Sequence, residues 1–318
     1  MGVTALEQGA EELRPPGLPS TPAGSSRRSL LAGSKPWRHP FILEGFTWVY
    51  LAWSILPIAI AVLFSFNNGK SQSAWQGFSI RWYITDPTQS VLHDPLLHAA
   101  VAQTLRLGLY VTVITVPLGV IFAIGIDRWR SRTSNGLNFV MIFSFVVPEL
   151  LLAVALLFVF TQMFTFVHLG TLAEVLALVV WNVSWPAVIV RARLIGIGKV
   201  YEEAATDLGA TRLSALRRVL LPMLMPAIFA SAVLVFASVI DDFVLVEQLS
   251  STAATQTMAV VIYGNVRGGL AGPALNALAT LMLAFSLVIA ILGYVGYRFM
   301  TRGERGAATS ALTSIAGM

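Results

Sequence analysis

Three acidic residues lie inside stretches of the sequence that are otherwise strongly apolar. Asp241 and Asp242 stand side by side in one of these stretches, and Glu149 follows Pro148 near the middle of another. At the centre of a bilayer an acid costs about 2.5–3.5 kcal/mol on insertion scales, so it usually faces a protein interior or a pathway. We therefore treat these carboxylates as candidates for a pathway through a membrane. The alternatives are that they cap a broken helix or pair with Arg106.

A second concentration of charge lies in the segment 200–222. Glu203 and Asp207 are one helical turn apart, so they project from the same face of a predicted short helix. Gly209 can adopt the left-handed conformation that ends a helix, and Thr211 is a suitable N-cap for the next one. The sequence therefore predicts two short helices separated by a turn. The apolar face of the first helix consists of Tyr201, Ala205 and Leu208.

The second of these short helices combines an apolar stripe with positive charge. A helix resting on lipid headgroups would explain its arginines. It would not explain Glu203 and Asp207, which anionic lipid repels. A mixed-charge, apolar-striped helix pair is better suited to fill a groove on a soluble partner. The stripe consists of Leu213, Leu216 and Leu220, and the charges are Arg212, Arg217 and Arg218.

The sequence lacks the residues for several kinds of catalysis. A phosphate-binding loop needs Gly, four residues and then Gly-Lys-Ser/Thr, but the Gly-Lys-Ser that begins at Gly69 has Phe64 where the first Gly is required. The four histidines share no metal-ligand spacing, and the absence of cysteine excludes thiolate sites. We expect no metal site, no catalytic residue and no ATP hydrolysis by this chain itself.

The elements that must position the charged groups are membrane helices. Of the 318 residues, 56% are apolar and 12% are charged, against about 25% charged in soluble domains. The apolar residues form six blocks, each long enough for a helix across a hydrocarbon core about 30 Å thick. Prolines inside four of the blocks predict kinks. The predicted spans are 46–66, 98–126, 137–160, 172–190, 223–248 and 275–298, and the prolines are Pro57, Pro117, Pro148 and Pro186.

The segments outside the spans predict the orientation and the domain limits. With the N-terminus in the cytoplasm, 17 of the 21 Lys and Arg lie on the inner side, as the positive-inside rule requires. Residues 1–40 and 301–318 are predicted to be disordered cytoplasmic tails, the first because its Pro, Gly, Ser and charge leave too little apolar area to bury. The first apolar block begins too late for a signal peptide. One six-helix domain, 41–300, lies between the tails.

The first outer loop, between the first two predicted spans, is rich in aromatic residues. Trp and Tyr gather where a membrane meets water, so we expect an interfacial aromatic belt here rather than a ligand contact. The residues concerned are Trp75, Phe78, Trp82 and Tyr83.

The segment 200–222 resembles the EAA loop of ABC importer permeases. That signature reads Glu-Ala-Ala, three residues, Gly, nine residues, Ile, any residue and Leu-Pro, and here Val219 replaces the Ile. The resemblance implies that this loop couples a permease to a partner ATPase. The coupling residues it implies are Glu203, Ala204, Ala205, Asp207, Leu208, Gly209, Arg212, Leu221 and Pro222.

Over the range 46–298 the sequence also resembles permeases of spermidine/putrescine importers, of the C type. For a polyamine, carboxylates beside aromatic faces are the expected lining, by charge pairing and cation–π attraction. The resemblance thus implies that Asp241, Asp242 and Glu149 belong to the substrate pathway. The similar segments are 78–83, Pro148-Glu149, Asp241-Asp242-Phe243-Val244 and 276–280.

The resemblance implies an all-α integral membrane protein with six transmembrane helices and the type I ABC importer permease fold, in a bacterial inner membrane. The expected partners are a sister permease, identical or different, two ATPase subunits that hold ATP and Mg²⁺, and an extracytoplasmic solute-binding protein. The chain itself is expected to bind no cofactor and to catalyse no reaction. Two alternatives stay open: an importer of another solute, such as an aminophosphonate or ferric ion, and a secondary transporter or channel, against which the EAA loop argues.

Overall fold

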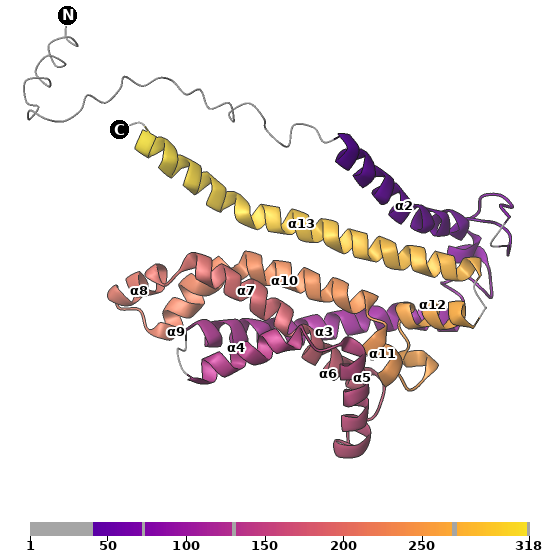
Figure 1. Ribbon diagram of the computed structural model, residues 1–318, viewed down its shortest axis with the longest axis horizontal. Coiled ribbons are helices and arrows are strands. Elements are labelled where there is room, and N and C mark those ends of the chain that lie inside the picture. The colour runs from indigo at the N-terminus through magenta and orange to yellow at the C-terminus, as the bar shows by residue number, and fades with distance from the viewer. Residues whose placement is uncertain (1–40, 72–73, 129–131, 269–271, 317–318) are drawn as a thin grey trace, which may run out of the picture. The chain divides into compact units, whose positions relative to one another are not determined.

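The computed structural model describes residues 41–71, 74–128, 132–268 and 272–316. The predicted tail 1–40 lies outside these residues. Within them every regular element is a helix (Figure 1), and the β-type contact is an isolated antiparallel bridge between Asn67 and Phe78. The prediction of an all-α membrane protein is confirmed.

The first described helix is α2, from Phe41 to Ser65. Its length and composition suffice to cross a bilayer, and Pro57 lies inside it without ending it. The chain divides into two compact units within this helix, 1–56 and 57–318. The elements that follow all belong to the second unit.

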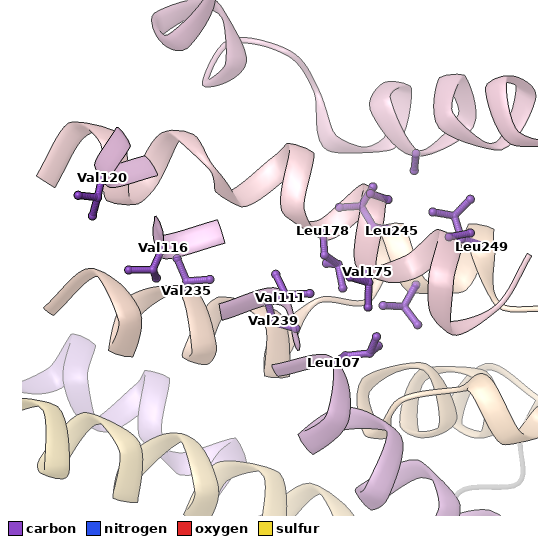
Figure 2. Close-up of a cluster of buried hydrophobic side chains, with 14 of the residues drawn as sticks. Leu107, Val111, Val116, Val120, Val175, Leu178, Val235, Val239, Leu245 and Leu249 are labelled. Atoms are coloured by element: carbon purple, nitrogen blue, oxygen red, sulfur yellow. The ribbon is translucent and has the colours of Figure 1, made fainter. Parts of the chain in front are cut away.

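Four helices form the centre of the second unit. They are α3 (Pro95–Arg128), α6 (Thr171–Asn182), α7 (Ser184–Ile197) and α10 (Leu221–Asp241), and α3 packs against the other three. Branched apolar side chains of α3, α6 and α10 and of the segment 244–249 gather in one cluster (Figure 2), so burial of apolar area holds the bundle together. The labelled core residues are Leu107, Val111, Val116, Val120, Val175, Leu178, Val235, Val239, Leu245 and Leu249.

Five of the predicted spans overlap helical segments that are long and apolar enough to cross a membrane. Helices α6 and α7 together form one candidate span, with a break at Val183 between them. The remaining predicted span, 137–160, is bent, so the described residues hold five membrane-length helices, or six with the bent pair. The candidate spans are Leu43–Ser65, Pro95–Arg128, Thr171–Ile197, Arg212–Asp241 and Pro273–Thr301.

The predicted third span is not one helix. Helix α4 (Arg132–Ser144) and helix α5 (Glu149–Phe158), which continues as the π-helical turn η2 (Val159–Met163), meet at an angle of 107°. Pro148 lies at the corner in an extended conformation and forms the N-cap of α5. A kink was expected here, but the structure has a sharp corner because α5 packs on helix α11 instead of continuing the line of α4.

The predicted fifth span, 223–248, ends earlier than expected. Helix α10 stops at Asp241, Asp242 is extended, and the short helix α11 (Val244–Leu249) starts anew. The acid pair therefore lies at the end of the span and not within it. The physical reason is that two adjacent carboxylates disfavour a helix interior, whereas one of them can accept backbone N–H groups at the start of α11.

The chain continues through the 3₁₀ turn η4 (Ala253–Thr255) and helix α12 (Met258–Arg267) into α13 (Pro273–Ala316). Helix α13 passes residue 300, where the domain was expected to end, so the segment 301–316 is helical and not a disordered tail. Alanine is frequent in this segment, and alanine has the highest helix propensity.

The first outer loop buries one of its expected interfacial aromatics. Trp82, in the π-helical turn η1 (Arg81–Thr85), is only 1% exposed and donates its indole N–H to the carbonyl of Asn67 at 2.6 Å. Its role is therefore to close the loop, whereas Phe78 is exposed as a belt residue would be. The expectation of an interfacial belt residue is wrong for Trp82, because its indole N–H is hydrogen-bonded within the protein.

The same loop is held by a carboxylate that accepts several hydrogen bonds. The side chain of Asp86 accepts the backbone N–H groups of Thr88 and Gln89 at 3.0 and 2.9 Å and forms an ion pair with Arg81 at 2.7 Å. The N–H groups of Thr88 and Gln89, together with the Arg81 guanidinium, hold the pKa of Asp86 well below its ordinary value.

Candidate functional site

Helix α8 (Val200–Asp207), the first helix of the loop 200–222, ends at a turn around Gly209. The φ of Gly209 is +88°, and its N–H donates to the carbonyl of Thr206 at 2.9 Å. The N–H of Ala210 donates to the carbonyl of Ala205 at 3.0 Å. This pair of bonds is the Schellman motif, which requires a left-handed residue at the glycine position. The conformation predicted for Gly209 is confirmed.

The second helix of the loop, α9 (Arg212–Ala215), begins at Thr211 as predicted. The Thr211 hydroxyl accepts the N–H of Ser214 at 3.3 Å. The π-helical turn η3 (Leu216–Leu220) then leads directly into α10, in which Leu221 and Pro222 are the first two residues. Leu220 is fully buried in the bundle core, so the loop is joined firmly to span five at this end.

The loop leaves an apolar and acidic surface exposed. Leu208 is 91% exposed and Leu213 is 72% exposed, although both belong to the predicted apolar stripes. Among the other predicted coupling residues, Glu203, Ala204, Asp207 and Arg212 are exposed and Ala205 is half-buried. Exposed leucines beside charges mark an interaction surface rather than a folded interior.

One contact in this region was not anticipated from the sequence. Arg128, the last residue of α3, donates from Nε to Glu202 at 3.0 Å and from Nη2 to the same carboxylate at 2.5 Å. Nη2 also donates to the carbonyl of Gly198 at 3.0 Å, and Nη1 pairs with Asp127. No spacing rule could have found this pair, because 74 residues separate Arg128 from Glu202.

The predicted pathway acids fall into two separate environments. Asp242 is 6% exposed, accepts the N–H of Leu245 at 3.1 Å, and interacts with the carboxyl group of Glu149 in the first turn of α5. Asp242 therefore caps α11, and its carboxyl group faces that of Glu149 at the start of α5. The sequence alternative of a cap on a broken helix describes its backbone contact.

Asp241 points into a different space. It is exposed to a cavity of about 560 Å³ between α10, α12 and α13, and Ser286 of α13 donates to its Oδ1 at 3.5 Å. Phe243 and Tyr263 also line this cavity, with ring centroids 4.1 Å apart and planes tilted by 43°. Tyr263 was not predicted as a site residue, because nothing in the sequence places α12 beside the acid pair.

The suggested ion pair with Arg106 is not seen. In the part of the chain that the structure describes, Arg106 is exposed on α3 and has no acidic partner within ion-pair distance.

The apolar remainder of the cavity beside Asp241 consists of Ala259, Ile262, Val266, Ala279, Met282 and Leu283. A carboxylate and two aromatic rings set in apolar walls can bind an elongated cation, by charge at one point and by aliphatic and cation–π contact elsewhere.

The fold and the exposed loop define a membrane permease of the ABC importer class. The structure resembles a chain of a bacterial ABC transporter involved in the import of the acidic polysaccharide alginate, with a TM-score of 0.67, 15% identity, and coverage of 82% of this chain and 96% of that one. It also resembles a chain of the MetNI methionine ABC transporter, with a TM-score of 0.55, 20% identity and coverage of 69% and 100%. At these identities the likeness concerns the fold alone.

The chain belongs to the family described as binding-protein-dependent transport system inner membrane component, which matches residues 115–308. It is 34% identical over 275 residues to the putrescine transport system permease protein PotI of Escherichia coli K12, covering 85% of this chain and 92% of that protein. It is 32% identical over 265 residues to the spermidine/putrescine transport system permease protein PotC of the same strain, covering 82% and 96%. The protein is therefore a multi-pass inner-membrane transport component.

Proposed function

We propose that this chain is a permease subunit of an ATP-driven importer and forms half of the translocation pathway for a polyamine or a similar small organic cation. The observation that carries the choice of solute is the position of Asp241 in a cavity with Phe243 and Tyr263. Putrescine and spermidine carry ammonium groups on an aliphatic chain, so their charges need carboxylates and their methylenes need apolar or aromatic walls. The names of the relatives PotI and PotC support the same solute class.

The second acidic site, formed by Asp242 and Glu149, is a further part of the proposed pathway. Asp242 and Glu149 lie together at the junction of α10, α11 and α5, and both are less accessible than Asp241. We assign them to the wall of the pathway near this junction. Asp241 is the residue that meets the solute directly.

Energy for transport comes from partners. The exposed face around Glu203, Leu208 and Leu213 is suited to dock into an ATPase subunit, because apolar side chains supply contact area and the acid supplies specificity. ATP and Mg²⁺ are held by two such subunits, and this chain is not an enzyme and binds no cofactor. A sister permease and an extracytoplasmic solute-binding protein complete the assembly.

In the proposed cycle, closure of the ATPase pair moves the docked loop, and the two permeases switch from inward-facing to outward-facing to accept solute. The positive-inside distribution of Lys and Arg supports an orientation with both termini and this loop in the cytoplasm.

The test is transport by the complete complex. Proteoliposomes that contain both permeases and the ATPase, supplied with the binding protein and radiolabelled spermidine or putrescine, are expected to accumulate the amine only when ATP is present. Glu203→Lys reverses the charge offered to the ATPase, so uptake is expected to vanish while membrane insertion persists. Uptake of an anionic solute without any uptake of amines would contradict the proposed solute class.

A further inference from the structure

Arg128 joins three elements of the inner side that are far apart in the sequence. Its guanidinium bonds to the carboxylate of Glu202 on α8 and to the carbonyl of Gly198, which ends α7, while Arg128 itself ends α3. The side chains of Arg128 and Glu202 are 18% and 24% exposed, so water screens this pair less than a surface ion pair. We call this arrangement the Arg128 clasp.

The clasp uses the planar geometry of arginine. Nε and Nη2 face the Glu202 carboxylate together, and Nη2 also reaches Gly198. A fork that makes several bonds fixes direction as well as distance, which a lysine ammonium cannot do. Helix α8 is therefore held in a defined orientation relative to the ends of α3 and α7.

The clasped helix α3 reaches the other end of the bundle. Near its outer end, Gln103 donates to the buried carboxylate of Glu174 on α6 at 2.9 Å. The hydroxyl of Thr104 accepts the backbone N–H of Met258, the first residue of α12, at 2.9 Å. Thr104 and Arg128 are about 36 Å apart along the helix, at 1.5 Å per residue. One continuous helix thus connects the loop 200–222 to the helix that carries Tyr263.

The geometry points to Arg128 as the positioning residue that passes movement of α8 to α3, with Glu202 as its partner. This inference rests on the proposed function, since it concerns how the docked loop moves the transport pathway. Glu203 and the exposed leucines meet the ATPase, whereas Glu202, one residue away, faces inward to the clasp. The loop therefore has one acid for the partner and one for its own bundle.

The first experiment measures spermidine uptake per ATP hydrolysed in proteoliposomes with the complete complex. Arg128→Gln and Glu202→Gln are each expected to keep assembly and basal ATPase activity within about twofold and to lower uptake per ATP at least fivefold. The exchange Arg128→Glu with Glu202→Arg restores the ion pair but not the bond to Gly198, so it is expected to raise uptake per ATP above that of either single variant without reaching wild type. Arg128→Lys is expected to fall between. Arg298→Gln, which removes an exposed inner-side charge of α13, is the matched control and is expected to match wild type.

The second experiment reads movement without depending on the solute. Because the chain has no cysteine, an environment-sensitive fluorophore can be placed at Thr206→Cys on α8 or at Arg267→Cys on α12. In the wild-type background both labels are expected to respond to ATP. With Arg128→Gln only the Thr206→Cys label is expected to respond.

Two outcomes would overturn the inference. One is that uptake per ATP in the single variants equals that of wild type, or that the charge exchange gives no more uptake per ATP than the single variants. The other is an undiminished response at Arg267→Cys with Arg128→Gln. If the wild-type complex took up no amine, the proposed solute would fail instead, and the fluorescence result would still decide the role of Arg128.

Discussion

The carboxylates of Asp241 and Asp242 are adjacent in the sequence but face different parts of the molecule. Asp241 opens to the cavity beside Ser286, whereas Asp242 is buried against Leu245 and Glu149. Helix α10 ends at Asp241, and the backbone of Asp242 is extended, so the two residues do not belong to one regular helix. One acid is thus available to a solute, and the other is needed to hold α11.

Asp241→Asn is expected to weaken transport without harming assembly. A hydrogen bond to a charged group contributes about 1.5–3 kcal/mol, so the KM for spermidine is expected to rise at least about tenfold. The complex should form in normal amounts because Asp241 is exposed. Glu247→Gln removes an exposed acid of α11 that does not line the cavity, and it serves as the control. Equal KM values for the two variants would place the solute elsewhere.

Asp242→Ala is expected to lower stability more than Asp242→Asn. Alanine leaves the N–H of Leu245 without its acceptor and costs about 0.5–2 kcal/mol, as loss of a helix cap does. Asparagine keeps an acceptor oxygen and removes one of two facing carboxylates. Thermal unfolding of the purified complex measures the difference between the two variants. Identical unfolding midpoints for Asp242→Ala and Asp242→Asn would show that the cap contributes nothing.

Tyr263→Ala is expected to reduce affinity for amines, whereas Tyr263→Phe keeps the ring face and most of the affinity. A cation–π contact contributes about 0.5–2 kcal/mol, which corresponds to about a 2- to 30-fold change in KM. Uptake kinetics with putrescine and spermidine provide the measurement. A loss in Tyr263→Phe as large as that in Tyr263→Ala would assign the effect to the hydroxyl group.

Gly209→Val is expected to abolish coupling. Valine resists a φ of +88° because its branched Cβ clashes with the backbone, so the turn between α8 and α9 must change. Asparagine tolerates the left-handed region, so Gly209→Asn is expected to retain much of the coupled transport activity. ATPase stimulation by loaded binding protein distinguishes the variants, and full stimulation in Gly209→Val would remove the turn from the mechanism.

The outer loop is expected to resist acid. The folded pKa of Asp86 lies below its unfolded value of about 3.9, so its stabilisation is complete above that pH and disappears only as the pH falls through the lower folded value. Hydrogen exchange of the segment 81–94 should therefore be protected equally at pH 7 and pH 5. Asp86→Asn should reduce this protection at both pH values by the same factor. A wild-type loss of protection between pH 7 and pH 5 would contradict this assignment.

Local signals in the sequence predicted local structure well. The turn at Gly209, the cap at Thr211 and five of the spans follow from residue type and from the length of the apolar blocks. Pro148 indicated a kink, but its angle depends on the packing of α5 against α11, which no local pattern encodes.

Contacts between segments that are distant in the sequence could not be predicted from sequence patterns. Trp82 was expected to be a belt residue, but its N–H donates to the carbonyl of Asn67, and the pairing of Glu202 with Arg128 was not anticipated. Tyr263 joined the acid site only through the packing of α12 beside α10 and α13. Each of these depends on tertiary packing, which the pattern of a single segment does not contain.

The corner between α4 and α5 has a consequence for how the chain is made. Neither arm is long enough to cross the hydrocarbon core alone: α4 has 13 residues, and α5 has 10, to which η2 adds five. The partner of α5 is α11, which the ribosome synthesises much later. Span three is therefore expected to reach its final shape only after span five has been synthesised.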